Sequence, residues 1–176
     1  MNVLSHDKRR YGDGRLPAFH FFMRKAQACS VFPLKQFYKI LFVFFRKINH
    51  NDISLKTQIG PGLYFGHPYC IVINPGVIIG TNVNIHKGVT IGQENRGKRK
   101  GTPIIGNDVW IGINTTITGK VSIGNDVLIA PNSFVNLDIP DHSVVIGNPA
   151  KIFPKEKATE GYINHRIHVE NNENKK

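Results

Sequence analysis

The chain has 176 residues, 40% of them hydrophobic, which is about one domain with a sizeable core. Its longest apolar run, residues 40–45, is far too short to span a bilayer, and its start lacks the apolar stretch of a signal peptide. The net charge of +11 is concentrated, because residues 1–50 carry +8 and residues 94–101 carry +3. This placement predicts an anionic partner for those two segments. We expect no nucleic-acid partner, because the chain has no recognised nucleic-acid-binding motif.

The two cysteines, Cys29 and Cys70, show neither paired spacing nor a metal-binding pattern. Such a pair predicts buried free thiols in the reducing cytosol, so we expect a cytoplasmic protein. No group of His, Cys and Asp residues has ligand spacing, and we therefore expect no metal.

Residues 1–50 form a basic, aromatic N-terminal segment. Residues 1–16 are interpreted as a polar lead, and residues 17–48 as two helical pieces separated at Pro33. The second piece has apolar residues at helical spacing: Leu34, Phe37, Tyr38, Leu41, Phe45 and Ile48. One interpretation is a cap that shields the open end of the repeat region that follows. The other is a helix on the inner face of an anionic membrane, a peripheral contact compatible with the first.

A six-residue rhythm of aliphatic side chains runs from about Ile53 to Ile146. One line of the repeat consists of Ile53, Ile59, Phe65, Ile73, Ile79, Ile85, Ile91, Ile105, Ile111, Ile117, Ile123, Ile129 and Val135. A second line consists of Val77, Val83, Val89, Val109, Val121 and Val127. A hexapeptide repeat is typical of a parallel β-helix, in which three units make one coil and the coils stack. We therefore predict an all-β domain over residues 51–153.

The rhythm is interrupted twice. An eight-residue step separates Phe65 from Ile73, and a fourteen-residue step separates Ile91 from Ile105. The second step has eight residues in excess, so residues 93–102 must leave the coil as an exposed loop, a common place for function on a rigid scaffold. Residues 154–176 are interpreted as a polar, mobile tail.

The stretch DISLKTQIGPGLYFGH, from Asp52 to His67, resembles the serine acetyltransferase branch of the hexapeptide-repeat acyltransferases, in its polysaccharide-biosynthesis form. The resemblance continues through IVINPGVIIGTNVNIHKGVTIG and PIIGNDVWIGINTTITGKVSIGNDVLIAPNSFV to GNPAKI, and covers roughly residues 52–152. It implies a left-handed parallel β-helix, a homotrimer and an acetyl-CoA-dependent O-acetyltransferase.

The family's catalytic base falls on His67, and the Asp that orients this base falls on Asp52. The chemistry suits the pair, because an imidazole near neutral pKa can accept the proton of an attacking hydroxyl. A carboxylate on the other ring nitrogen would fix the tautomer and stabilise the imidazolium.

The family recognises its amino-acid acceptor with charged residues at three positions. At these positions this chain has Gly66, Gly101 and Thr102 instead. Their loss favours another hydroxyl acceptor, a sugar of a surface polysaccharide or its precursor. The alternatives are a serine O-acetyltransferase of cysteine biosynthesis and a non-catalytic β-helix scaffold.

The remaining candidates are placed by position. The acceptor site is assigned to Thr102, His86 and Gln93, although the alternative for His86 is a structural turn residue. The acetyl-CoA groove between subunits is assigned to Gly92, Trp110, Gly112, Ala130 and Lys151. The basic loop residues 96–100 can hold an anion or be solvated. Asp108 and Asp126 are interpreted as caps of their turns.

Overall fold

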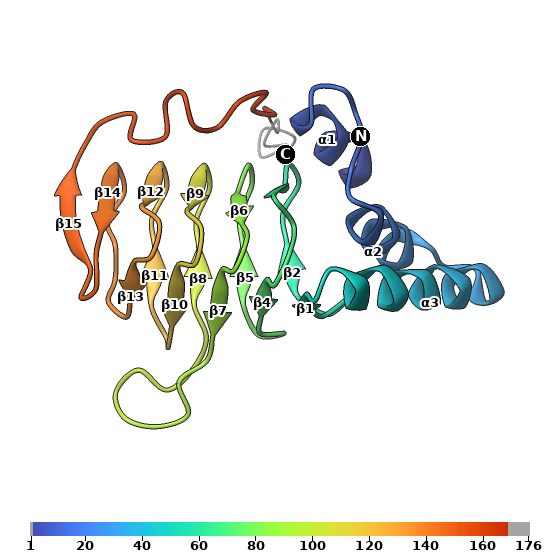
Figure 1. Ribbon diagram of the computed structural model, residues 1–176, viewed down its shortest axis with the longest axis horizontal. Helices are drawn as coiled ribbons and strands as arrows, with labels where there is room; N and C mark the ends of the chain where they lie inside the picture. The colour runs from blue at the N-terminus through green and yellow to red at the C-terminus, as the bar shows by residue number, and fades with distance from the viewer. Residues whose placement is uncertain (1, 169–176) are drawn as a thin grey trace, which may run out of the picture.

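The computed structural model describes residues 2–168 and is a parallel β-helix preceded by three helices (Figure 1). Sheet A contains β1 (Asp52–Ile53), β4 (Val72–Ile73), β7 (Thr90–Gly92), β10 (Thr116–Thr118) and β13 (Phe134–Val135). Sheet B contains β2 (Gln58–Ile59), β5 (Ile78–Ile79), β8 (Ile104–Ile105) and β11 (Ser122–Ile123). Sheet C contains β3 (Tyr64–Gly66), β6 (Asn84–His86), β9 (Val109–Ile111), β12 (Val127–Ile129), β14 (Ser143–Ile146) and an antiparallel edge strand, β15 (Lys151–Pro154). The chain visits A, B and C in turn, which confirms the predicted β-helix.

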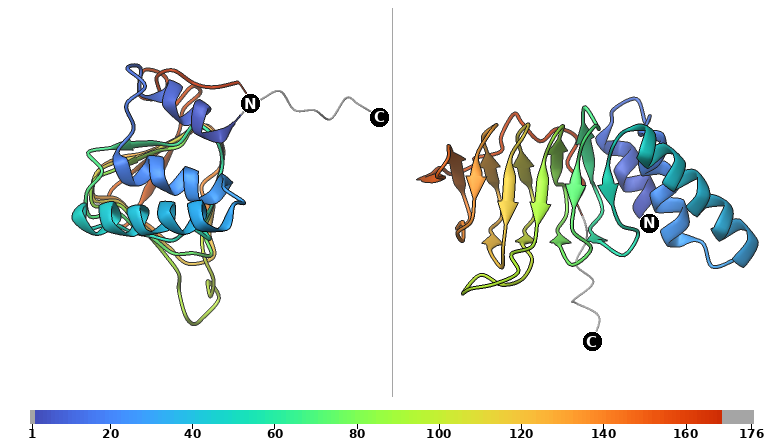
Figure 2. Two further views of the ribbon diagram at one scale, coloured as in Figure 1. Left: turned by 90° about the vertical axis from the view of Figure 1, so that its right-hand side faces the viewer. Right: turned by 60° about the horizontal axis from the view of Figure 1, so that its bottom comes forward.

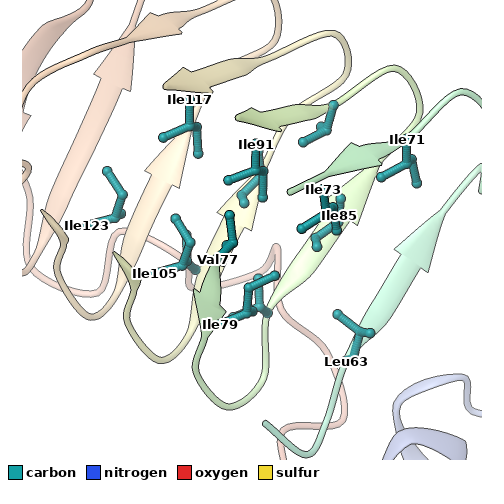
Figure 3. Close-up of a cluster of buried hydrophobic side chains, with 14 of the residues drawn as sticks. Leu63, Ile71, Ile73, Val77, Ile79, Ile85, Ile91, Ile105, Ile117 and Ile123 are labelled. Carbon is teal, nitrogen blue, oxygen red and sulfur yellow. The ribbon is translucent and has the colours of Figure 1, made fainter. Parts of the chain in front are cut away.

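The hexapeptide residues fill the interior of the stack. Figure 3 shows side chains such as Ile73, Ile91 and Ile117 pointing into the core from successive coils. Every residue of both predicted lines is buried except Ile59, which is partly buried against the core. The register explains this, because equivalent residues pair directly, as Ile91 does with Ile73 and with Ile117. One coil alone would leave these side chains in water, so the core exists only as a stack.

The glycines that follow sheet B allow the coils to approach closely. A Cβ atom on Gly60 would lie 2.6 Å from the carbonyl oxygen of Gly80 in the next coil, and one on Gly106 would lie 2.6 Å from that of Gly124. Only a residue without a side chain fits at these equivalent positions of successive coils.

The N-terminal segment differs from its prediction in two places. Its first part is a helix, α1 (Val3–Arg10), where a polar lead was expected. Next come α2 (Ala18–Ala28) and α3 (Phe32–Ile48), and Pro33 lies in the first turn of α3 rather than between the two helices. A proline is tolerated there because the first amides of a helix have no intrahelical acceptor. None of the helices within residues 2–168 is long and apolar enough to cross a membrane.

A buried cluster of charged side chains closes the first coil. Asp7 on α1 accepts hydrogen bonds from the amides of Gly62 (2.8 Å) and Leu63 (3.0 Å). It also accepts bonds from Arg24 Nε (2.7 Å) and His20 Nε2 (2.9 Å). The Arg24 guanidinium in turn donates to the carbonyl oxygens of residues 59 and 60 at 2.9 and 2.7 Å. These bonds satisfy backbone groups that the end of a stack would otherwise leave without partners.

Residues 155–168 are not a mobile tail but an ordered segment, which we call the strap. The strap runs back along the turns between sheets B and C towards α1 (Figure 1). Asp126 accepts hydrogen bonds from the amides of Ala158 (2.9 Å) and Thr159 (3.0 Å), and Asp108 pairs with Arg166 at 3.4 Å. The two turn aspartates therefore hold the strap instead of capping only their own turns. The rest of the expected tail, 169–176, lies outside the described residues.

The apolar stripe of α3 is largely uncovered, in contrast to that of α2. Phe19 and Met23 of α2 are fully buried against the first coil, whereas the only buried residue of α3 is Phe42. Phe37 and Leu34, two members of the predicted stripe, are exposed. Helices α1 and α2 therefore cover the first coil, and α3 projects beyond it (Figure 2). Elsewhere, the two cysteines are free, but Cys70 is exposed and Cys29 is partly exposed rather than buried.

Candidate active site

His67 lies at the corner where the chain passes from sheet C to sheet A, which we call the C–A corner. The first interruption of the repeat falls here, because the turn of residues 67–71 is longer than the equivalent turn of residues 87–89 in the next coil. His67 has a left-handed backbone with φ of 51°, and its carbonyl oxygen accepts a 2.7 Å hydrogen bond from the Tyr69 amide. A non-glycine residue in this conformation costs about 1 kcal/mol or more and often marks a functional position. The turn holds the imidazole out in solvent.

Asp52 stands at the same corner, one coil earlier, but its carboxylate is not bonded to His67. The adjoining Asn51 links the two coils, donating to the Pro68 carbonyl (3.0 Å) and accepting from the Ile71 amide (2.9 Å). The Asp52 carboxylate instead pairs with Arg46 of α3, at 3.0 Å. Within residues 2–168 no hydrogen bond joins Asp52 to His67. The Asp52 side chain remains 77% exposed, so its second oxygen is open to another donor.

His86 is the imidazole that the structure brings next to His67. Strand β3 pairs with strand β6 so that Gly66 lies opposite His86. Because Gly66 has no side chain, there is room for the His86 ring: a Cβ atom on Gly66 would lie 2.6 Å from His86 Nε2. His86 Nδ1 lies 2.8 Å from the carbonyl oxygen of Ile111, which acts only as an acceptor. The bond therefore places the proton of the neutral ring on Nδ1 and leaves Nε2 as a proton acceptor.

The pKa of His86 is lowered, which keeps its ring neutral at physiological pH. Burial is the largest cause, the charge of the neighbouring His67 lowers the pKa further, and the hydrogen bond to Ile111 opposes both. The C–A corner thus holds an exposed histidine next to a neutral one.

A pocket of about 550 Å³ opens on the outer face of sheet C, with His86 in its wall. The walls come from the loop after α1, from sheet C and from the strap. The Trp110 ring packs between those of His86, at 4.6 Å between centroids, and Tyr162, at 5.2 Å. Arg10 is buried against the pocket, and its guanidinium donates to Gly62 O (3.1 Å), Asn164 O and Asn84 Oδ1, all of them neutral acceptors. Burial lowers the pKa of Arg10 to about 10, so it stays charged and gives the pocket a positive wall.

The expected acceptor residues of the loop lie at a different corner from His67. Thr102 and Gln93 flank the loop at the A–B corner, where Thr102 Oγ1 donates to Gly76 O (2.8 Å) and Gln93 bonds Asn74. The loop leaves the coil as predicted (Figure 1) and is stiffened by a Glu94–Gly101 bridge. The width of sheet A separates this group from the histidines, so one chain does not bring them together.

The residues assigned to the coenzyme are also divided between different corners of the β-helix. Gly112 and Ala130 follow β9 and β12 at the C–A corner, on the two coils beyond His86. Gly92 ends β7 near the loop, and space around its Cβ position is open. Lys151 begins the edge strand β15 and is exposed, while Trp110 lines the sheet C pocket. Gly112 and Ala130 alone share a corner with His67.

Several residues of the pocket have no signal in the sequence. Arg10 and Tyr11 fall in the segment interpreted as a lead, and Tyr162 falls in the segment interpreted as a tail. Each reaches sheet C only through the packing of α1 or the strap, which no local pattern reports. The motif HDKRRY at residues 6–11 does place Arg10 and Tyr11 three and four residues after Asp7, the spacing of neighbours on one helix face.

The fold is that of hexapeptide-repeat acetyltransferases. The family model of that name, the bacterial transferase hexapeptide (six repeats), matches residues 102–136. Serine acetyltransferase 2 of Arabidopsis thaliana is 40% identical over 101 residues, which are 57% of this chain and 31% of that protein. The serine acetyltransferase of Helicobacter pylori is 35% identical over 112 residues, 64% of this chain and 66% of that protein.

Solved structures show the same relationship. The serine acetyltransferase of Brucella abortus superposes with a TM-score of 0.72 at 27% identity, covering 89% of this chain and 70% of that one. The soybean enzyme complexed with serine gives a TM-score of 0.70 at 26% identity, with coverages of 86% and 67%. The chain carries the repeats of the hexapeptide-repeat transferases at residues 102–136 and is similar to serine acetyltransferases over its β-helix. It spans between about a third and two thirds of the length of the two curated relatives named above.

Proposed function

We propose that this protein is an acetyl-CoA-dependent O-acetyltransferase in which His67 is the general base. The observation that carries the proposal is the exposed His67 on a strained turn, produced by an interruption of the repeat, at the corner that also presents Gly112 and Ala130. The relatives named acetyltransferase support it, since they align with the β-helix that holds this corner.

The reaction follows from the chemistry of an alcohol and a thioester. His67 accepts the proton of the acceptor hydroxyl as its oxygen attacks the carbonyl carbon of the acetyl thioester. The tetrahedral intermediate collapses by breaking the carbon–sulfur bond, and the imidazolium returns the proton to the leaving thiolate. Asp52 would stabilise the imidazolium if its open carboxylate oxygen turns towards His67.

We propose a homotrimer, the assembly that the family resemblance implies and that the distribution of the site supports. A single β-helix presents His67 and the loop residues Thr102 and Gln93 at different corners, whereas a neighbouring subunit can place its loop against another's C–A corner. We infer that the complete site lies between subunits, and size-exclusion chromatography with light scattering should give a mass of three chains.

L-serine is the acceptor that the comparisons favour, because the relatives reported above are serine acetyltransferases and one was solved with serine bound. The relatives do not support a polysaccharide acceptor.

One observation keeps a neutral sugar hydroxyl as a second candidate. The space where a side chain at Gly66 would stand is filled by His86, and Thr102 is bonded to the backbone of Gly76. The charged groups that the family resemblance places at positions 66, 101 and 102 are absent, which leaves the ammonium and carboxylate of serine without these partners.

Coenzyme release from acetyl-CoA, measured with L-serine and with a panel of sugars, tests both the transferase activity and the identity of the acceptor. Release with serine supports serine as the acceptor, and release only with sugars moves the acceptor to the second candidate. No release with any acceptor, from a folded trimer that binds acetyl-CoA, would contradict the transferase itself.

A further inference from the structure

The most unusual surface of the molecule is the outer side of α3. Its exposed apolar side chains include three phenylalanines and are not confined to one end of the helix. Their exposed fractions are 73% for Phe32, 43% for Leu34, 54% for Phe37, 68% for Ile40, 39% for Val43, 56% for Phe44 and 54% for Ile48. We call this set the α3 face. At about 100° per residue it spreads over roughly half of the helix circumference, wider than a two-stranded coiled-coil seam.

The α3 face does not cover the β-helix. The opposite side of the helix does the packing, with Phe42 buried and Phe45 stacked on Phe22 of α2 at 5.5 Å between centroids. Helix α3 extends away from the coils (Figure 2), and the exposed fractions given above show that the α3 face is turned to solvent. An exposed apolar patch of this extent marks a surface that binds something.

The charges around the α3 face are predominantly positive. Residues 14–51 contain seven Lys and Arg and no Asp or Glu. Lys35, Lys39 and Arg46 line a pocket of about 780 Å³ beside α3, together with Lys56 and the apolar side chain of Phe42. The one carboxylate there, Asp52, is already paired with Arg46. A cationic pocket with an apolar floor suits a phosphate group attached to a hydrocarbon chain.

We propose that the α3 face and this basic pocket bind the surface of an anionic phospholipid bilayer. The apolar side chains enter the boundary between head groups and acyl chains, and the lysines contact lipid phosphates. A second copy of the chain is the competing occupant, but two such faces would bring like charges together. This inference does not rest on the acceptor or on the catalytic role of His67.

The first test is co-sedimentation of the full chain with vesicles of phosphatidylcholine, with and without phosphatidylglycerol. We expect binding to the anionic vesicles at low salt, weakening as salt screens the charges, and little binding to the neutral ones. Equal binding to both, or no binding to anionic vesicles at low salt, overturns the proposal.

A matched pair of aromatic variants locates the apolar contact. Phe37→Ser should weaken binding by about tenfold or more, as expected for losing one buried aromatic side chain. Phe153→Ser, on β15 at the other end of the stack and 49% exposed, should leave binding unchanged. If Phe37→Ser instead lowers the mass in light scattering and leaves vesicle binding unchanged, the α3 face is an interface between copies and the proposal is wrong.

A second pair locates the charge contact while holding net charge equal. Lys35→Gln with Lys39→Gln should weaken binding to anionic vesicles by about 30-fold, the contribution of two lysines at a lipid surface. Lys155→Gln with Lys157→Gln, both on the strap, should have little effect. Equal losses in the two double variants would show that only net charge matters and would overturn the proposed site.

Discussion

The molecule contains two sets of Asp, His and Arg side chains that resemble each other in composition and differ in surroundings. In the first, Asp7, His20 and Arg24 are almost wholly buried, and the carboxylate is bonded to both partners. In the second, Asp52 is bonded to Arg46 alone, and His67 stands exposed nearby. In the first set the carboxylate uses its hydrogen bonds within the fold, which makes the set structural. In the second set the imidazole of His67 and one oxygen of Asp52 are still free to bind another group, as a reactive site requires.

The pKa values follow the same division. Burial lowers the pKa of His20 despite its bond to Asp7, so this ring is neutral at physiological pH. Burial alone would raise the pKa of Asp7, but the hydrogen bond from His20 and the charge of Arg24 outweigh it and hold the pKa below its usual value. Asp7 and Arg24 therefore form a buried ion pair with His20 as a neutral donor.

The largest expected effect on stability comes from breaking the buried set. Asp7→Ala should lower the free energy of unfolding by about 3–5 kcal/mol, because it leaves Arg24 buried without its counter-ion. Denaturant unfolding at pH 7 measures this. Asp13→Ala, which removes an exposed carboxylate from the same region, should cost less than about 1 kcal/mol. Similar values for the two would contradict a structural role for the buried cluster.

Asp52→Asn should separate chemistry from stability. The exposed Asp52–Arg46 pair is expected to contribute less than about 1 kcal/mol to folding. Turnover should nevertheless fall by about tenfold, since the variant loses the charge that would stabilise the imidazolium. Steady-state kinetics beside an unfolding curve gives both numbers. Unchanged turnover would leave Asp52 as a surface ion pair only.

The smallest expected effect is a pH dependence of stability due to His20. Its folded-state pKa lies below the unfolded value of about 6.5, so the unfolded chain binds more protons in the window between the two. Stability should therefore fall as the pH drops from 7 to 5, whereas the contribution of Asp7 persists down to about pH 4. His20→Gln should flatten the dependence between pH 7 and 5, and His50→Gln, at an exposed position, should not. Equal slopes in the three proteins would contradict the assignment.

The sequence predicts the repeating part of the fold well, because each coil obeys the same local rule. Ile91 is buried for the reason that Ile73 and Ile117 are buried, and the interruptions of the rhythm correctly locate the loop and the turn of His67. The N-terminal cap and the strap obey no such rule. Asp7 meets Gly62, and Asp126 meets Thr159, across 55 and 33 residues of sequence.

The candidate site shows the same limit. His67 and Asp52 are found from the resemblance, and the structure places both at one corner. The bond from Arg46 to Asp52 and the neutral tautomer of His86 depend on where α3 ends and on how Gly66 faces the next coil. Composition and spacing carry no information on either.

The most direct measurement is the turnover of acetyl-CoA by His67→Asn, compared with the wild type and with His86→Asn. Asparagine tolerates the left-handed backbone of position 67, so the turn should survive while the base is lost. We expect turnover to fall by about 10²–10⁴-fold with acetyl-CoA binding and unfolding unchanged, and a smaller loss for His86→Asn. Wild-type turnover in His67→Asn, or a larger loss in His86→Asn, would show that the exposed histidine is not the base.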